Sequence, residues 1–165
     1  MHKCLYMICP TDQLEPVINN RFKGHNYFYT TLGNTLVLDK NAIRQIAMLI
    51  QMYSIKEITF ILAEDNCIVR DALNNQKFIE TVGLKEAYAH LQEHRKNVQN
   101  SCHMLNYTAL LLSYLLNQKI KELRAGLHGL LAAQPLINGK LFEKDSRRFK
   151  RIYSELVFAD SINLN

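Results

Sequence analysis

The sequence predicts an α/β fold in which a mostly parallel sheet is flanked by helices, in a single domain that covers residues 1–165. Two continuous apolar segments, Lys3–Cys9 and Glu57–Ala63, are typical of strands buried on both faces, as in parallel sheets. A helical pattern lies between them, and strand–helix–strand order predicts a right-handed crossover with parallel pairing. A chain of 165 residues suits one substantial core better than two.

Local patterns predict the elements of the first half. Pro10 ends the first apolar segment, and a second strand is expected at Asn26–Leu32. Asp39 is a typical N-cap residue for the helix that follows. The apolar residues of this helix recur at the three- and four-residue spacing of an amphipathic helix that lies on a sheet: Ile43, Ile46, Ala47, Ile50 and Tyr53.

The second half predicts two helices, at Leu84–His94 and Val98–Gln118. A strand or hairpin is expected at Leu127–Phe142 around Asn138-Gly139, and a last helix at Ser146–Phe158. One helix carries a leucine stripe over too wide an arc for a surface helix, which predicts either core or a subunit interface and makes dimerisation the natural inference. The stripe consists of Leu105, Leu111, Leu112, Leu115 and Leu116.

Composition and charge narrow the class of protein. The apolar run Leu5–Cys9 is too short for a signal peptide, and Met104–Leu116 is too short and too polar to cross a bilayer, so we expect a cytoplasmic protein without a membrane partner. The formal charge is +5, but basic and acidic residues are interspersed. The basic stretch Lys144–Arg151 is more typical of an exposed face than of a nucleic-acid interface, so no nucleic-acid partner is expected.

The four cysteines lie far apart, which argues against a disulfide framework and favours free or metal-bound thiols. Cys4, inside the first strand, and Cys102 are expected to be core or boundary residues. Cys9 and Cys67 follow the predicted ends of two strands, and Glu64 lies three residues before Cys67. Ligands of open parallel sheets collect at the carboxyl ends of the strands, so these three side chains could converge there.

Two thiolates, a carboxylate and one water would make a four-coordinate open zinc site from Cys9, Glu64 and Cys67. The alternative is that both cysteines are small buried apolar residues, which is the more common role of intracellular cysteines.

The motifs resemble those of the β-carbonic anhydrases, from Lys3 to about Phe142. Members of that family bind zinc with a Cys in a Cys-x-Asp-x-Arg turn and with a later His-x-x-Cys pair. Leu32-Gly33-Asn34 matches their Ala-Gly-Asn, which places Gly33 and Asn34 in the substrate pocket by resemblance. The resemblance implies zinc as cofactor, reversible hydration of carbon dioxide to bicarbonate, and a homodimer or higher homo-oligomer.

The sequence also departs from the family pattern. Glu64 stands at the zinc-binding His, and Thr11 and Gln13 stand at the Asp and Arg that orient the zinc-bound hydroxide. Asp12 could substitute for the family Asp only if the turn shifted by one residue. Because second-shell losses each cost roughly tenfold to a hundredfold, we expect hydration to be weak or lost. The alternatives are a non-catalytic homodimeric scaffold or binding protein with the same fold, and a changed reaction in the same pocket.

Overall fold

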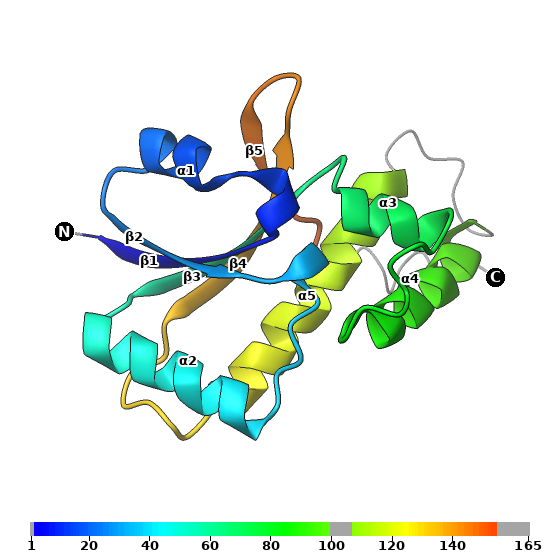
Figure 1. Ribbon diagram of the computed structural model, residues 1–165. Coiled ribbons are helices and arrows are strands. Elements are labelled where there is room, and N and C mark those ends of the chain that lie inside the picture. Colours follow the sequence, from blue (N-terminus) through cyan, green and yellow to red (C-terminus); the bar gives the residue numbers. More distant parts are fainter. Residues whose placement is uncertain (1, 100–106, 155–165) are drawn as a thin grey trace.

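The computed structural model describes residues 2–99 and 107–154, which form a five-stranded sheet with helices on both faces (Figure 1). The strand order is β2-β1-β3-β4-β5; the first four strands are parallel, and β5 is antiparallel to β4. The strands are β1 Lys3–Ile8, β2 His25–Thr30, β3 Glu57–Ala63, β4 Leu136–Glu143 and β5 Arg148–Arg151. The helices are α1 Glu15–Arg21, α2 Lys40–Tyr53, α3 Cys67–Leu73, α4 Leu84–Gln99 and α5 Tyr107–Leu127, with short 3₁₀ turns η1 Pro10–Asp12 and η2 Leu32–Asn34.

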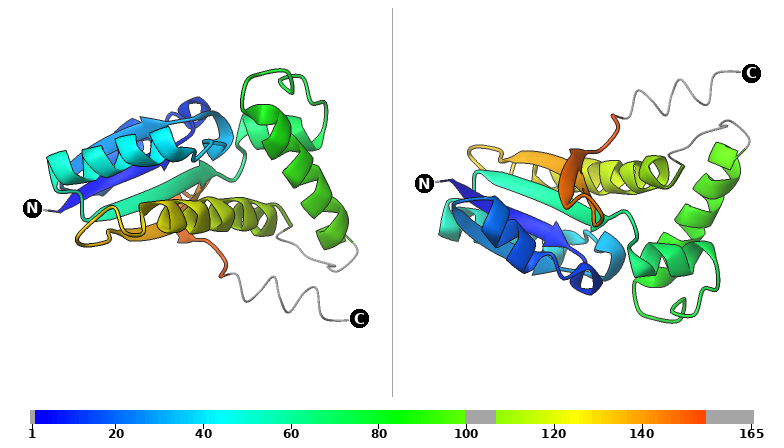
Figure 2. Two further views of the ribbon diagram at one scale, coloured as in Figure 1. Left: turned by 90° about the horizontal axis from the view of Figure 1, so that it is seen from below. Right: turned by 90° about the horizontal axis from the view of Figure 1, so that it is seen from above.

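The sheet separates two apolar cores, because side chains alternate between its faces. Helices α2 and α5 cover one face, and α1 covers part of the other (Figure 2). On β1, Leu5 and Met7 join the core under α2 and α5, whereas Tyr6 and Ile8 join the core under α1. The predicted α/β class, the buried first and third strands and the parallel pairing are therefore confirmed.

Helix α2 follows its predicted pattern closely. The carboxylate of Asp39 accepts a hydrogen bond from the backbone N–H of Ala42 at 2.8 Å, as expected of an N-cap. The four apolar residues from Ile43 to Ile50 are buried against the sheet, whereas Tyr53 is 37% exposed and packs its ring against Tyr27.

The leucine stripe belongs to the core of a single chain. Leu111, Leu112, Leu115 and Leu116 of α5 pack among residues of β3, β4 and α2, so core is the correct one of the two predicted roles. Leu105 and Cys102 lie outside the described residues. Cys4 is buried as predicted, and its burial raises the pKa of the thiol to about 11, which keeps the thiol neutral at physiological pH.

The predicted C-terminal elements need correction. The helix predicted at Ser146–Phe158 is wrong for its first half, since Arg148–Arg151 is strand β5, paired with Lys140–Glu143; residues 155–165 lie outside the described part. Of the strand or hairpin expected at Leu127–Phe142, the strand is correct from Leu136 onward, and the hairpin is wrong because Asn138 and Gly139 lie inside β4 and the chain turns at residues 144–147.

Gly139 has a packing role instead of a turn role. A Cβ atom there would lie 2.6 Å from the Ile152 side chain, so the glycine leaves room for Ile152 against the sheet. The helix predicted to end at Gln118 continues to Leu127, and the predicted second strand ends at Thr30, two residues early. Among the described helices, none is long and apolar enough to cross a membrane.

Candidate functional site

The predicted site residues lie at the carboxyl edge of the two central strands. Strand β1 pairs with β3, so the turn η1 that follows β1 lies beside the turn that leads from β3 into α3 (Figure 1). Cys9 directly follows β1, and Glu64 directly follows β3. This edge is where open parallel sheets bind their ligands.

The Cys9 thiol is fully buried and has two hydrogen-bond partners. The backbone N–H of Gly33 donates to Cys9 Sγ at 3.1 Å, and the Thr11 hydroxyl lies 3.0 Å from the same sulfur. Gly33 adopts φ 58°, a left-handed conformation that favours glycine, and a Cβ there would lie 3.0 Å from Ile68. Cys9 and Gly33, which were predicted separately as site residues, are thus in direct contact.

Asn34 ties the two central strands together. Its side-chain amide donates to the backbone oxygens of Met7, at 3.2 Å, and of Ile61, at 2.8 Å. The side chain is 1% exposed, and its Oδ1 atom has no hydrogen-bond partner in the structure. Both hydrogen bonds of the side chain are therefore structural, and the unpartnered oxygen leaves one acceptor for a donor.

Asp12 has a structural role that the sequence did not predict. Its carboxylate accepts hydrogen bonds from the backbone N–H of Ala63 at 2.9 Å and from the Asn66 side-chain amide at 2.8 Å. Burial raises the pKa of Asp12, and the two hydrogen bonds offset this only in part. The carboxylate joins the turn after β1 to the end of β3.

Asn66 is a site residue that the sequence analysis missed. Its carboxamide oxygen caps α3 by accepting from the backbone N–H groups of Ile68 and Val69, at 3.1 and 3.0 Å. The available signal was an Asn immediately before a helical segment, which is the typical N-cap arrangement.

Thr11 and Gln13, at the positions of the family Asp and Arg, are both exposed. Gln13 has φ 53° and ends the η1 turn through its backbone N–H, which donates to Pro10. A neutral hydroxyl and a neutral amide replace a charged pair at this place, so the described site lacks the charge-assisted contact that the family turn would supply.

Glu64 and Cys67 are both more exposed than the buried Cys9. The Glu64 carboxylate lies 3.4 Å from the Lys150 ammonium of β5, and its side chain is 28% exposed. Cys67 is exposed as the first residue of α3. Glu64 therefore has a cationic partner on β5.

The ligand atoms of the three predicted zinc ligands do not all lie within 4.8 Å of one another. Within the described part of the chain, the ligand atoms that do gather within 4.8 Å of one another are those of His2, Cys4 and Glu57; Cys9, Glu64 and Cys67 form no such group. A four-coordinate zinc binds its ligand atoms at 2.0 to 2.3 Å, so the ligand atoms themselves must come closer to one another than 4.8 Å. No reaction step through zinc follows from this arrangement.

No protein-family model and no curated protein match the sequence. Solved structures do: the β-carbonic anhydrase CafA of Aspergillus fumigatus has a TM-score of 0.73 at 14% identity, over 98% of this chain and 81% of that one. Wild-type CafD of the same fungus has 0.70 at 16% identity, over 93% and 90%. One of two tetrameric β-carbonic anhydrases of Sordaria macrospora has 0.66 at 16% identity, over 93% and 81%.

The chain thus has the fold of the β-carbonic anhydrases, as its motifs predicted. The match extends over nearly the whole chain, including the β1–α1–β2 segment that carries the first cysteine motif. At 14 to 16% identity the comparison establishes the fold and leaves the reaction to the site residues themselves.

Proposed function

We propose that this β-carbonic-anhydrase-like protein has weak or lost hydration of carbon dioxide. The observation that carries the proposal is the use of Asp12 and Glu64 in structural contacts. Asp12 is bonded to Ala63 and Asn66, and Glu64 is paired with Lys150. In the family, zinc supplies an acidic bound water that becomes the attacking hydroxide.

The size of the expected loss in hydration rate follows from the substituted residues. Thr11 and Gln13 remove two groups that would orient a zinc-bound hydroxide, and each such loss costs roughly tenfold to a hundredfold. As a zinc ligand beside two thiolates, Glu64 would add a third negative charge, which disfavours formation of hydroxide at neutral pH. Together these changes predict hydration at least about a hundredfold slower than that of an active β-carbonic anhydrase.

The test is stopped-flow hydration of carbon dioxide by the purified chain with zinc supplied, beside an active β-carbonic anhydrase at equal concentration. We expect a rate at least about a hundredfold lower. A rate within tenfold of the active enzyme would overturn the proposal.

A second candidate function, binding of a small anion without catalysis, is favoured by a cavity of about 540 Å³ beside β5. Five cationic side chains line it, with the rings of Phe22 and Phe149, and within the described residues no carboxylate lines it. None of its four arginines makes an ion pair within that part of the chain. The cationic residues are Arg21, Lys140, Arg147, Arg148 and Arg151.

Calorimetric titration with inorganic phosphate and with bicarbonate tests this second candidate. We expect Arg148→Ala/Arg151→Ala to weaken binding, and Arg70→Ala, at an exposed position of α3 outside the cavity, to leave it unchanged. Equal anion binding by the parent and both variants would show that this cavity is not the binding site.

We also propose a homo-oligomeric assembly. The tetrameric state of the Sordaria macrospora enzymes supports it, and β2 lies at the edge of the sheet with half-buried aromatic residues Tyr27 and Tyr29. Sedimentation velocity should give a mass at least twice that of the chain, and a monomer at micromolar concentration would contradict this.

A further inference from the structure

The amino edge of the sheet carries a group of three metal-binding side chains, at the opposite end from Cys9. The His2 imidazole Nε2 lies 2.7 Å from Glu57 Oε2, and one ligand atom each of His2, Cys4 and Glu57 all lie within 4.8 Å of one another. Cys4 is on β1 and Glu57 begins β3, and these residues are register partners in the parallel pair. We propose that His2, Cys4 and Glu57 form a binding site for zinc.

This site is separate from the one predicted from the motifs. Cys4 and Cys9 are five residues apart on an extended strand, which corresponds to roughly 16 Å. Their side chains also join different cores, since Cys4 packs on the α1 side of the sheet and Cys9 on the α2 and α5 side. The inference therefore does not rest on the proposed function.

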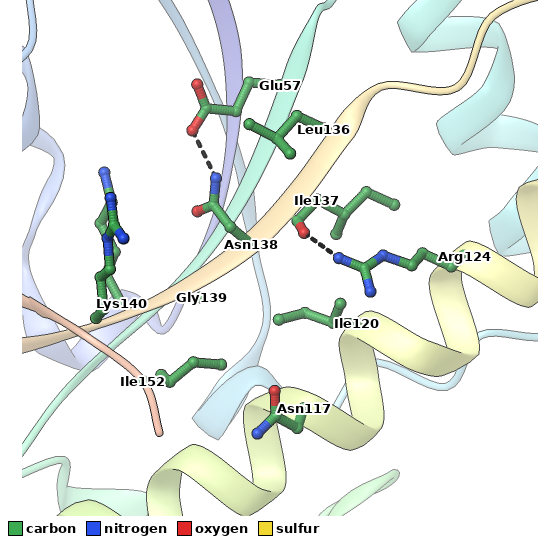
Figure 3. Close-up of a pocket in the computed structure, with 11 residues that line it drawn as sticks. Glu57, Asn117, Ile120, Arg124, Leu136, Ile137, Asn138, Gly139, Lys140 and Ile152 are labelled. Atoms are coloured by element: carbon green, nitrogen blue, oxygen red, sulfur yellow. Dashed lines mark hydrogen bonds between the residues drawn. The ribbon is translucent and has the colours of Figure 1, made fainter. Parts of the chain in front are cut away.

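The Glu57 carboxylate is held in place by two further residues. The Asn138 amide donates to Glu57 Oε1 at 2.7 Å, as Figure 3 shows, and the Thr59 hydroxyl donates to the same oxygen at 3.1 Å. Both bonds leave Oε2 directed at the His2 ring. Carboxylate ligands of metals are commonly fixed by such outer contacts, because these contacts orient the ligand before the metal arrives.

The chemistry of the three groups suits zinc. Thiolate, imidazole and carboxylate are its usual protein ligands, and three of them with one water make a four-coordinate open site. From the usual bond lengths, tetrahedral ligand atoms lie about 3.4 to 3.6 Å apart. His2 and Glu57 would separate slightly, and the His2 side chain, which is 55% exposed, has the freedom to rotate.

The surroundings also offer an unused acceptor. Asn138 Oδ1 is buried without a hydrogen-bond partner, although the amide nitrogen of the same side chain is bonded to Glu57. A water that completes the metal shell could donate to this oxygen. The competing interpretation is a simple His2–Glu57 ion pair beside an unrelated core cysteine.

The zinc affinity of the untagged chain distinguishes the zinc site from the simple ion pair. It can be measured by competition with a chromophoric chelator. We expect one zinc per chain. His2→Ala, Cys4→Ser and Glu57→Gln should each weaken binding more than a hundredfold. Thr59→Val removes outer contacts to Glu57 and Cys4 and should weaken binding roughly tenfold to a hundredfold. His2 is exposed at the chain start, so its variant tests the site without a risk to folding.

The double variant Cys9→Ser/Cys67→Ser is the matched control, and it should bind zinc as the parent does. With cobalt in place of zinc, the thiolate charge-transfer absorption should disappear in Cys4→Ser and persist in this control. The proposal is overturned if the parent binds no zinc, if His2→Ala binds as tightly as the parent, or if the control alone loses the metal.

Discussion

The Asp12 carboxylate accepts a hydrogen bond from the backbone N–H of Ala63 at 2.9 Å, which links the turn after β1 to the last residue of β3. The second carboxylate oxygen accepts from Asn66, the residue that caps α3. One buried side chain therefore connects both turns at the carboxyl edge of the sheet. A group occupied in this way is no longer directed at a substrate.

Substitution of Asn66 should cost more stability than substitution of an ordinary N-cap. Asp39→Ala removes only a cap and should lower the free energy of unfolding by about 1 kcal/mol. Asn66→Ala removes a cap and also strips a buried Asp12 oxygen of its donor, which adds about 1 to 3 kcal/mol. Urea denaturation of both variants measures the difference, and equal losses would show that the Asp12 contact contributes nothing.

Asp12 should make stability depend on pH in a particular direction. Burial raises its pKa in the folded chain, so the folded state holds this proton more tightly than the unfolded state does. Its contribution to stability is then present below the ordinary Asp pKa of about 3.9 and is lost as pH rises through the raised value. The free energy of unfolding of Asp12→Asn, relative to the parent, should increase over this window.

Denaturation of both proteins at a series of pH values from the ordinary Asp pKa of about 3.9 upward tests this expectation. Asp145→Asn, in the exposed turn between β4 and β5, controls for the loss of one negative charge. A difference between Asp12→Asn and the parent that stays constant or falls with rising pH would contradict the direction of the shift.

Gly33 should be more sensitive to substitution than a glycine of similar conformation elsewhere. Gly33→Ala places a Cβ 3.0 Å from Ile68 and forces φ 58° on alanine, whereas Gly129→Ala, at φ 79°, meets no atom within 4 Å. The left-handed conformation alone costs about 1 to 2 kcal/mol. We expect Gly129→Ala to lose that amount of folding stability and Gly33→Ala to lose more. If thermal denaturation showed Gly129→Ala to be the less stable variant, the tight packing of Gly33 against Ile68 would be contradicted.

Restoring the family residues should raise activity if their loss is the cause of the defect. The triple variant Thr11→Asp/Gln13→Arg/Glu64→His should hydrate carbon dioxide at least about tenfold faster than the parent in stopped-flow assays. Adding Cys9→Ser to it should abolish the gain. A triple variant no faster than the parent would indicate that the limiting defect lies elsewhere.

Much of the fold could be predicted because its determinants are local. Continuous apolar runs define β1 and β3, and the spacing from Ile43 to Ile50 with the Asp39 cap defines α2. The segment after Ser146 was misjudged because its basic residues carry no clear period, and only pairing with Lys140–Glu143 makes Arg148–Arg151 a strand. Tertiary contact decides such segments.

The site could be predicted only in outline. The positions of Cys9, Gly33 and Glu64 at the carboxyl edge follow from strand order. The residues that they contact depend on side-chain orientation in the folded chain. Glu64 meets Lys150, 86 positions later in the chain, and Cys4 meets Thr59 across the sheet at 3.6 Å. No spacing rule connects residues so distant in sequence, so these contacts appear only in the folded chain.

The most direct test of this account is anomalous diffraction at the zinc absorption edge from crystals of the untagged chain grown with zinc. The account predicts a peak enclosed by His2, Cys4 and Glu57, and none between Cys9, Glu64 and Cys67. A peak bound by Cys9, Glu64 and Cys67 would contradict it, because the residues at the family's zinc position would then hold the metal after all.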